Sequence, residues 1–285
     1  MTTGAVHPPR LGHVPKASKI LALHYDEAAV KNYYESLPQE KRPYIQDFHH
    51  SNHATVLFNA MIHPLIEFPI RGVIWYQGCN NVGRAAQHQA LFQTLITDWR
   101  KCWKNPDMPF YFVQLANYLQ PSDLQPESLL RESQADALCL PHTGMVSNID
   151  LGDAKDIHPK TKREVGRRMA AIALNQTYGK HKTAFTAPVY ERYTVEADGI
   201  HIHFATPQGS EPLVIEDNLP GFILAGANRQ WHVAKAKVLS GNEVVVSCQG
   251  VHFPVAVRYG WADNPTCTLR TQSGLHVAPF RTDRW

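Results

Sequence analysis

The chain has 285 residues, of which 44% are hydrophobic and 19% are charged, and its formal net charge is +3. This length and composition are typical of a globular protein with one large domain or two modest ones. Because the basic residues are scattered and form no run or aromatic-basic stripe, we expect no nucleic-acid partner. No segment approaches about 18 consecutive apolar residues, so we also expect no membrane span.

The predicted elements begin with a short helix over 26–38, a polar stretch, and a second helix over 55–66. Three apolar runs, FPIRGVIWYQG, PFYFVQLANY and GMVSNIDLGD, then predict buried strands. Helical patterns lie between these strands, over 86–103 and over 127–140, and a third follows the last strand, between Pro159 and Gly179. Strands that alternate with helices through short loops predict βαβ units, a parallel sheet and hence an α/β fold.

After about residue 186 the pattern changes. Short alternating runs are separated by Gly, Asn and Pro, which predicts antiparallel strands. The last residues, TLRTQSGLHVAPFRTDRW, are expected to be irregular with apolar anchors. We therefore expect residues 186–258 to form a small β module separate from the parallel sheet.

The three predicted strands of the first half end in polar residues, at Gln77–Asn81, Gln114–Asn117 and Asp150–His158. The carboxyl ends of parallel strands share one edge of a sheet, where open α/β folds bind ligands. An Asn at such a place can cap the next helix, or it can donate hydrogen bonds to a developing oxyanion. Convergence of three polar ends favours a functional cleft.

The sequence Asp156-Ile157-His158-Pro159 is the sharpest local signal. An Asp close to a His can fix the tautomer of the imidazole, which can then act as a general base. The alternative is that Asp156 caps the helix that Pro159 opens, while His158 is packed or solvated. The residues alone leave both interpretations open.

Cysteine and histidine spacing gives no sign of a metal or a redox site. The five cysteines include no CxxC pair, and the 16 histidines are dispersed. We therefore expect no disulfide framework and no structural metal. The N-terminal residues lack an apolar h-region, so no signal peptide is expected, which fits a cytosolic or an incomplete chain.

Several long strings together resemble one family of enzymes. They are GVIWYQGCNN, DWRKCW, PFYFVQLANY, LRESQADAL, HTGMVSNIDLGDAKDIHPKTKREVGRRMAAIAL, GFILAGA, PVAVRYGWADNP and APFRTDRW. In this order, from about residue 53 to 285, they resemble the sialate O-acetylesterase family, which are carbohydrate esterases of the SGNH-hydrolase superfamily. Members of this family are often periplasmic or secreted, and the compartment of this chain is left open.

The resemblance implies an SGNH (flavodoxin-like) three-layer core that is N-terminally incomplete, with a small inserted antiparallel β module. It places a partial core in 1–185, the β module in 186–258, and a C-terminal segment that returns to the core in 259–285. Because the first core strand would be missing, we expect unpaired sheet edges and self-association.

The resemblance also implies roles for particular residues. His158 matches the catalytic base, Asp156 the acid, and Asn81 the donor to the oxyanion, while Gln77 and Gly78 match residues that line the substrate site. Asp150 and Asp153 remain alternatives for the acid. The family usually has Gly-Glu-Ser-Asn where this chain has Gly78-Cys79-Asn80-Asn81, so a Glu charge is lost.

The family's nucleophile, a Ser in a Gly-Gln-Ser-Asn block, is absent from this sequence. Ser51 in HHSNH is a weak candidate, and Cys79 would need a lowered pKa to replace it. The function that the resemblance implies is hydrolysis of O-acetyl esters on sialic acid or a related sugar by a Ser-His-Asp mechanism, which requires no metal and no organic cofactor. Without the Ser we expect little or no esterase activity. The alternative is an inactive remnant that binds carbohydrate or another partner.

Overall fold

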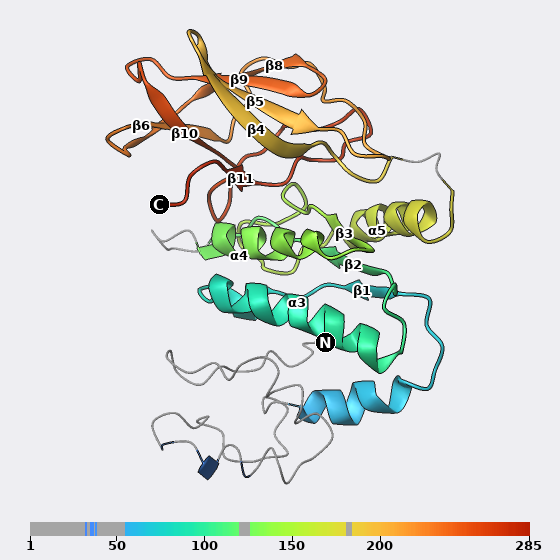
Figure 1. Cartoon of the computed structure of the whole chain (residues 1–285). Helices are drawn as coiled ribbons and strands as arrows, with labels where there is room; N and C mark the ends of the chain where they lie inside the picture. Colours follow the sequence, from blue (N-terminus) through green and yellow to red (C-terminus); the bar gives the residue numbers. More distant parts are fainter. Residues whose placement is uncertain (1–31, 33–34, 37, 39–54, 120–125, 181–183) are drawn as a thin grey trace. The chain divides into compact units, whose positions relative to one another are not determined.

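The computed structural model describes residues 32, 35–36, 38, 55–119, 126–180 and 184–285 (Figure 1). The chain divides into two compact units. One contains the described residues up to Val73 together with Ala86–Met108, and the other contains Ile74–Ala85 and the described residues from Pro109 to Trp285. The helix expected over 26–38 lies mostly outside the described residues.

The first unit contains two short helical elements and most of one long helix. They are η2 (Phe58–Ile62, a π-helix), η3 (His63–Leu65, a 3-10 helix) and α3 (Ala85–Cys102). In α3, Phe92 and Ile96 are buried, as the apolar stripe predicted. The regular helix expected over 55–66 is replaced by a π turn and a 3-10 turn, and Pro64, which has no N–H to donate, lies in the latter.

The second unit contains a three-stranded sheet in the order β1-β2-β3. These strands are β1 (Val73–Trp75), β2 (Phe110–Val113) and β3 (Thr143–Val146). Strands β2 and β3 are parallel, with Phe110 opposite Thr143. All four residues of β2 are buried, which explains its continuous apolar run. The three predicted strands are therefore present, but only the middle strand β2 is buried throughout: Ile74 of β1 is 72% exposed, and β3 alternates between buried and half-buried residues.

Helices α4 (Pro126–Ala135) and α5 (Lys162–Gln176) follow β2 and β3, and η5 (Asp136–Cys139) continues from α4. Helix α5 packs on the sheet through a cluster of buried residues: Tyr111, Val113, Val146, Val165, Met169 and Ile172. Gly144 in β3 allows this close packing, since a Cβ there would lie 2.9 Å from Cγ2 of Ile172. The βαβ arrangement predicted from the sequence is thus built around the buried strand β2.

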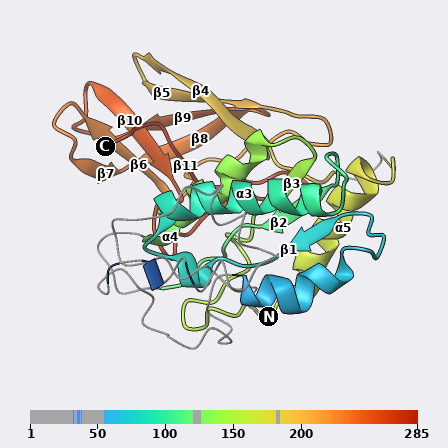
Figure 2. The same cartoon turned by 60° about the horizontal axis from the view of Figure 1, so that its bottom comes forward.

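The remaining strands form two antiparallel four-stranded sheets, in the orders β4-β5-β9-β8 and β11-β10-β6-β7 (Figure 2). Their bounds are Val189–Glu196 (β4), Gly199–Ala205 (β5), Phe222–Gly226 (β6), Trp231–Val233 (β7), Lys235–Ser240 (β8), Glu243–Ser247 (β9), Pro254–Tyr259 (β10) and Phe280–Arg281 (β11). Both sheets contribute to one hydrophobic cluster, for example through Ile202 and Leu224. The antiparallel strands expected after residue 186 are present and lie in sheets separate from β1–β3.

The C-terminal segment contacts both the antiparallel sheets and the helical part of the second unit. Strand β11 pairs with β10, and the Arg281 guanidinium donates to both carboxylate oxygens of Glu132 in α4, at 2.9 and 2.8 Å. The Arg131 guanidinium also donates to the carbonyl of Ala262 at 2.8 Å. The division at residues 185 and 258 stays a prediction.

Parallel and antiparallel sheets with flanking helices confirm the α/β class. Among the described residues, we find no helix with the length and apolar character needed to cross a membrane.

Candidate functional site

The loop after β1 presents a buried amide. Residues Cys79–Asn81 form a 3-10 turn, η4, and Asn81 is only 6% exposed. The Gln77 side-chain N–H donates to Oδ1 of Asn81 at 2.7 Å. This hydrogen bond fixes the carbonyl oxygen of the Asn81 side chain on the side of Gln77. The N–H₂ group of the same amide therefore faces away from Gln77, and it is a hydrogen-bond donor.

Gln134 in α4 connects this loop to the end of β2. Its Oε1 accepts a hydrogen bond from the backbone N–H of Leu115 at 2.9 Å, and its Nε2 donates to the carbonyl of Gln77 at 3.2 Å. A Cβ at Gly78 would lie 3.0 Å from this Nε2 and 3.1 Å from Cδ2 of Leu115, so a side chain there would push against both. Glycine at this position is therefore explained by close packing.

Contacts around Tyr76 join the loop after β1 to the segment after β3. The Asn148 side chain donates to the Tyr76 hydroxyl at 3.4 Å, and Nζ of Lys162 lies 4.4 Å from the centre of the Tyr76 ring. Lys162 is the first residue of α5, just after the Asp156–His158 loop. Burial raises the pKa of the Tyr76 hydroxyl, so the group stays neutral at ordinary pH. These contacts link the segments that follow β1 and β3, whereas convergence of the three predicted polar ends on one site stays a prediction.

Asp156 lies beside His158. Its Oδ1 accepts the backbone N–H of His158 at 2.8 Å and lies 3.4 Å from Nδ1 of the imidazole. The backbone hydrogen bond from His158 holds the pKa of the Asp156 carboxyl below its usual range. The imidazole is 80% exposed, so a ligand can reach it. The pair can therefore exchange protons with a bound molecule through the imidazole.

One part of the alternative, that Asp156 caps the helix, does not match the structure, whereas the other part, a solvated His158, does. Helix α5 begins at Lys162 with Thr161 as its N-cap residue, and the Thr161 hydroxyl donates to the carbonyl of Leu151 at 3.0 Å. The Asp156 carboxylate instead organises its own loop. A short Asx-type turn, and not the helix terminus, explains the hydrogen bond to the His158 N–H.

The two other acids considered for the site have different contacts. Asp150 accepts two hydrogen bonds from the Arg168 guanidinium, at 2.8 and 2.6 Å. Asp153 accepts the backbone N–H of Lys155 at 2.8 Å. Of the three, Asp156 is the one that the structure places beside the His158 imidazole.

Neither candidate nucleophile gains support. The Cys79 residue is exposed, yet desolvation and the nearby Glu127 charge raise the pKa of its thiol, which is the opposite of what a nucleophile needs. Ser51 lies outside the described residues. Within the described part of the chain, Gln77, Gly78 and Asn81 thus share one loop and Asp156 and His158 share another, and their union in one site stays a prediction.

Comparison with known proteins agrees with the resemblance seen in the sequence. Residues 44–175 match the family model described as carbohydrate esterase, sialic acid-specific acetylesterase. Mouse sialate O-acetylesterase is 29% identical over 255 residues, which cover 79% of this chain and 47% of that protein. For the human sialate O-acetylesterase, the identity is 28% over 252 residues, with 79% and 48% covered.

A solved structure shows the same fold. The crystal structure of a carbohydrate acetylesterase from Xanthomonas citri superimposes with a TM-score of 0.78 and 38% sequence identity, over 84% of this chain and 56% of that chain. This match confirms the SGNH-like fold class. The chain spans about half the length of the curated relatives it matches.

Proposed function

Since the chain is related to the sialate O-acetylesterase family, we propose that its site acts on O-acetyl esters of sialic acid or a related sugar. In this proposal, His158 is the general base, Asp156 holds the imidazole, and Asn81 donates to the oxyanion. Gln77 orients Asn81, and Gly78 leaves room for the close approach of the loop to Gln134 and Leu115.

The chemistry would follow the course of acyl transfer. A hydroxyl oxygen attacks the acetyl carbon while His158 takes its proton, and the carbonyl oxygen becomes an oxyanion that accepts hydrogen bonds from Asn81. When the tetrahedral intermediate collapses, the bond to the sugar oxygen breaks and that oxygen takes the proton from His158. In the family the attacking hydroxyl belongs to a Ser, and we assign it to no residue of this chain.

The observation that carries the proposal is the buried, oriented amide of Asn81 in the loop after β1. A buried donor held by a second side chain is preorganised, and this is the property that makes oxyanion stabilisation effective. The second candidate, a carbohydrate-binding remnant, is favoured by the loose Asp156–His158 contact of 3.4 Å and by the exposed imidazole.

The test measures hydrolysis of an aryl acetate and of an O-acetylated sialic acid by the purified chain. If the unmodified chain has measurable turnover, His158→Ala and Asn81→Ala should each lower it by at least about 100-fold, the usual loss of a general base or of one oxyanion donor. His232→Ala is the matched control, because His232 lies exposed on β7. Equal turnover by all variants would overturn the assignment.

If turnover is below detection, as expected from the absence of the Ser block, calorimetric binding of the O-acetylated sugar distinguishes the two candidates. Binding that weakens with Asn81→Ala would support the carbohydrate-binding remnant. Absence of both turnover and binding would contradict both.

A further inference from the structure

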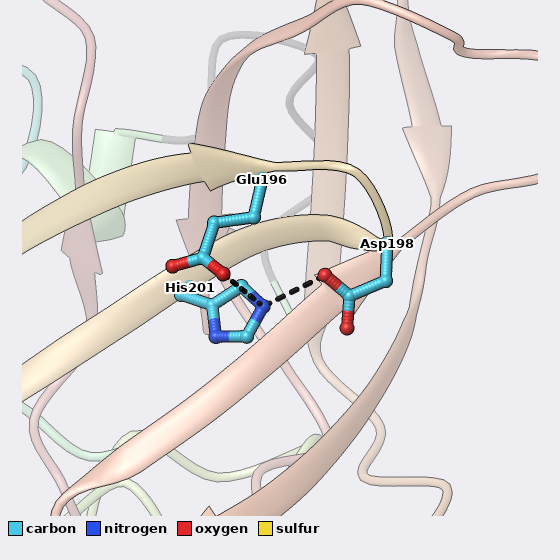
Figure 3. Close-up of side chains that lie close together, drawn as sticks. All are labelled: Glu196, Asp198 and His201. Carbon is cyan, nitrogen blue, oxygen red and sulfur yellow. Dashed lines mark hydrogen bonds and ion pairs between the residues drawn. The ribbon is translucent and has the colours of Figure 1, made fainter.

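A cluster of ionisable side chains lies on the β4–β5 hairpin and has no part in the proposed ester chemistry (Figure 3). Glu196 ends β4, Asp198 lies in the turn, and His201 belongs to β5. One ligand atom from each lies within 4.8 Å of the others. His201 is 6% exposed, whereas the two carboxylates are exposed. One side of the cluster is therefore buried in the protein, and the other side faces solvent.

The hairpin geometry explains why these residues meet. Glu196 pairs with Gly199 across the antiparallel ladder, which leaves a tight turn at Asp198. Gly199 adopts φ 148°, and a Cβ there would lie 2.4 Å from the carbonyl oxygen of Val246. The turn therefore requires glycine, and it directs both carboxylates towards the same nitrogen of His201, as Figure 3 shows.

A fourth residue fixes the imidazole. Oε1 of Glu243 in β9 lies 2.8 Å from Nδ1 of His201, so a hydrogen on Nδ1 donates to this carboxylate. Such a carboxylate behind a histidine is the usual orienting partner of a metal-ligating imidazole. Without an ion, the 2.9 Å contact between Nε2 and Oδ1 of Asp198 is a hydrogen bond that places a hydrogen on Nε2, and a metal ion would take the place of that hydrogen. Glu196 is also held, since the Thr194 hydroxyl donates to its Oε1 at 3.2 Å.

The spacing of the remaining atoms fits a small divalent ion. Nε2 of His201 lies 2.9 Å from Oδ1 of Asp198 and 3.8 Å from Oε2 of Glu196. In a tetrahedral zinc site with bonds of about 2.1 Å, ligand atoms are separated by about 3.4 Å, a value between these two distances. Small side-chain movements of the exposed carboxylates would equalise them.

We propose that His201, Asp198 and Glu196 bind a divalent transition-metal ion of the zinc type, with Glu243 as the residue that orients His201. Three protein ligands leave a fourth position for water, and an imidazole with two carboxylates suits Zn²⁺ better than the all-oxygen sites of Ca²⁺ or Mg²⁺. The three carboxylates of Glu196, Asp198 and Glu243 also exceed the single positive charge that His201 could carry. The bound ion would hold the β4–β5 turn, and the hydrogen bond between His201 and Glu243 joins that turn to β9.

The competing explanation is a proton in place of the metal. Burial lowers the pKa of the His201 imidazole, but the hydrogen bonds to Glu243 and Asp198 outweigh this effect and raise the pKa overall. A protonated His201 could therefore hold the same carboxylates without an ion. Metal binding requires Nε2 without its hydrogen, so the ion and this proton exclude one another.

The experiment titrates the chelator-stripped chain with Zn²⁺ alone by calorimetry, with metal analysis of the dialysed protein. We expect one tight site per chain that Asp198→Asn weakens at least about 10-fold and Glu243→Gln weakens about 10- to 100-fold. Asp217→Asn is the matched control, because Asp217 is an exposed acid that pairs with Lys237. The affinity of the Asp217→Asn variant for Zn²⁺ should equal that of the unmodified chain.

A second readout uses stability, which needs no catalytic activity. Zn²⁺ should raise the thermal midpoint of the unmodified chain and of Asp217→Asn, but not that of Asp198→Asn. Absence of a saturable site, or a site unaffected by Asp198→Asn and Glu243→Gln, would show that a proton holds this cluster and would overturn the proposal.

Discussion

At the scale of single residues, the Gln134 side chain controls the position of the loop that carries Asn81. Gln134 is 2% exposed and bonds Leu115 and Gln77. Gln134→Leu would leave the buried N–H of Leu115 without its acceptor, which costs about 1–3 kcal/mol of unfolding free energy. Urea denaturation measures this loss.

The matched control for this substitution is Gln176→Leu, because Gln176 is an exposed glutamine of helix α5. It should change the unfolding free energy by less than about 0.5 kcal/mol. Equal stability of the two variants would contradict the role assigned to Gln134.

The sequence singled out Gln77, Asn81, Asp156 and His158 as candidates because each follows a predicted strand and because the family resemblance implies a role for each. Gln134 was missed because its role depends on tertiary packing between residues far apart in the chain. One signal could have found it. In helix α4 the polar residues Arg131 and Gln134 accompany the apolar face at Leu130, and all three are buried. Polar residues on the apolar face of a helix indicate buried hydrogen-bond networks.

At the scale of elements, Glu164 joins the first turn of α5 to two arginines. Hydrogen bonds from Arg167, and then from Arg168, lower the pKa of its carboxyl from 4.5 to about 2. A carboxyl whose pKa is lower in the folded state stabilises the fold above its unfolded pKa. This contribution should be complete above about pH 4.5 and should disappear as the pH falls towards 2.

Urea unfolding at a series of pH values tests this linkage. Glu164→Gln should lower the stability at pH 7 by less than about 1 kcal/mol, since the carboxylate is partly exposed, and should have no effect near pH 2. Glu191→Gln, at an exposed position of β4, is the control and should show no such pH-dependent difference. A constant effect of Glu164→Gln at all pH values would contradict the assignment.

Element types were predicted better than element bounds. The helix expected over 127–140 ends at Ala135 and continues as the 3-10 turn η5, and Leu140, which precedes Pro141, is extended with ψ 137°. A residue before proline avoids the helical region, so the end of this stretch could be read from the sequence. The change from α to 3-10 hydrogen bonding cannot be predicted from the spacing of apolar residues. The same is true of the π-helix at Phe58–Ile62.

At the scale of the whole molecule, the two kinds of sheet followed from the change of pattern near residue 186. Strand β11 was not predicted from the sequence, and the C-terminal residues were expected to be irregular. With only Phe280 and Arg281, β11 is too short for a period-2 pattern, and its pairing with β10 is a non-local contact. The hydrophobic cluster of the antiparallel sheets also includes Ile149, which lies just after β3. Such contacts follow from packing and cannot be derived from local propensity.

Phe280 therefore provides a test of how far the C-terminal segment supports the antiparallel sheets. Its ring is stacked on Tyr190, with centroids 4.8 Å apart, and meets the edge of Phe204 at 5.7 Å. Phe280→Ala would remove these contacts and leave a cavity, which costs about 3–5 kcal/mol. Phe253→Ala is the control, since Phe253 is 84% exposed. Chemical denaturation should show the loss for Phe280→Ala alone, and hydrogen exchange should become faster in β4, β5 and β10. Unchanged exchange in those strands would mean that the sheets are stable without this segment.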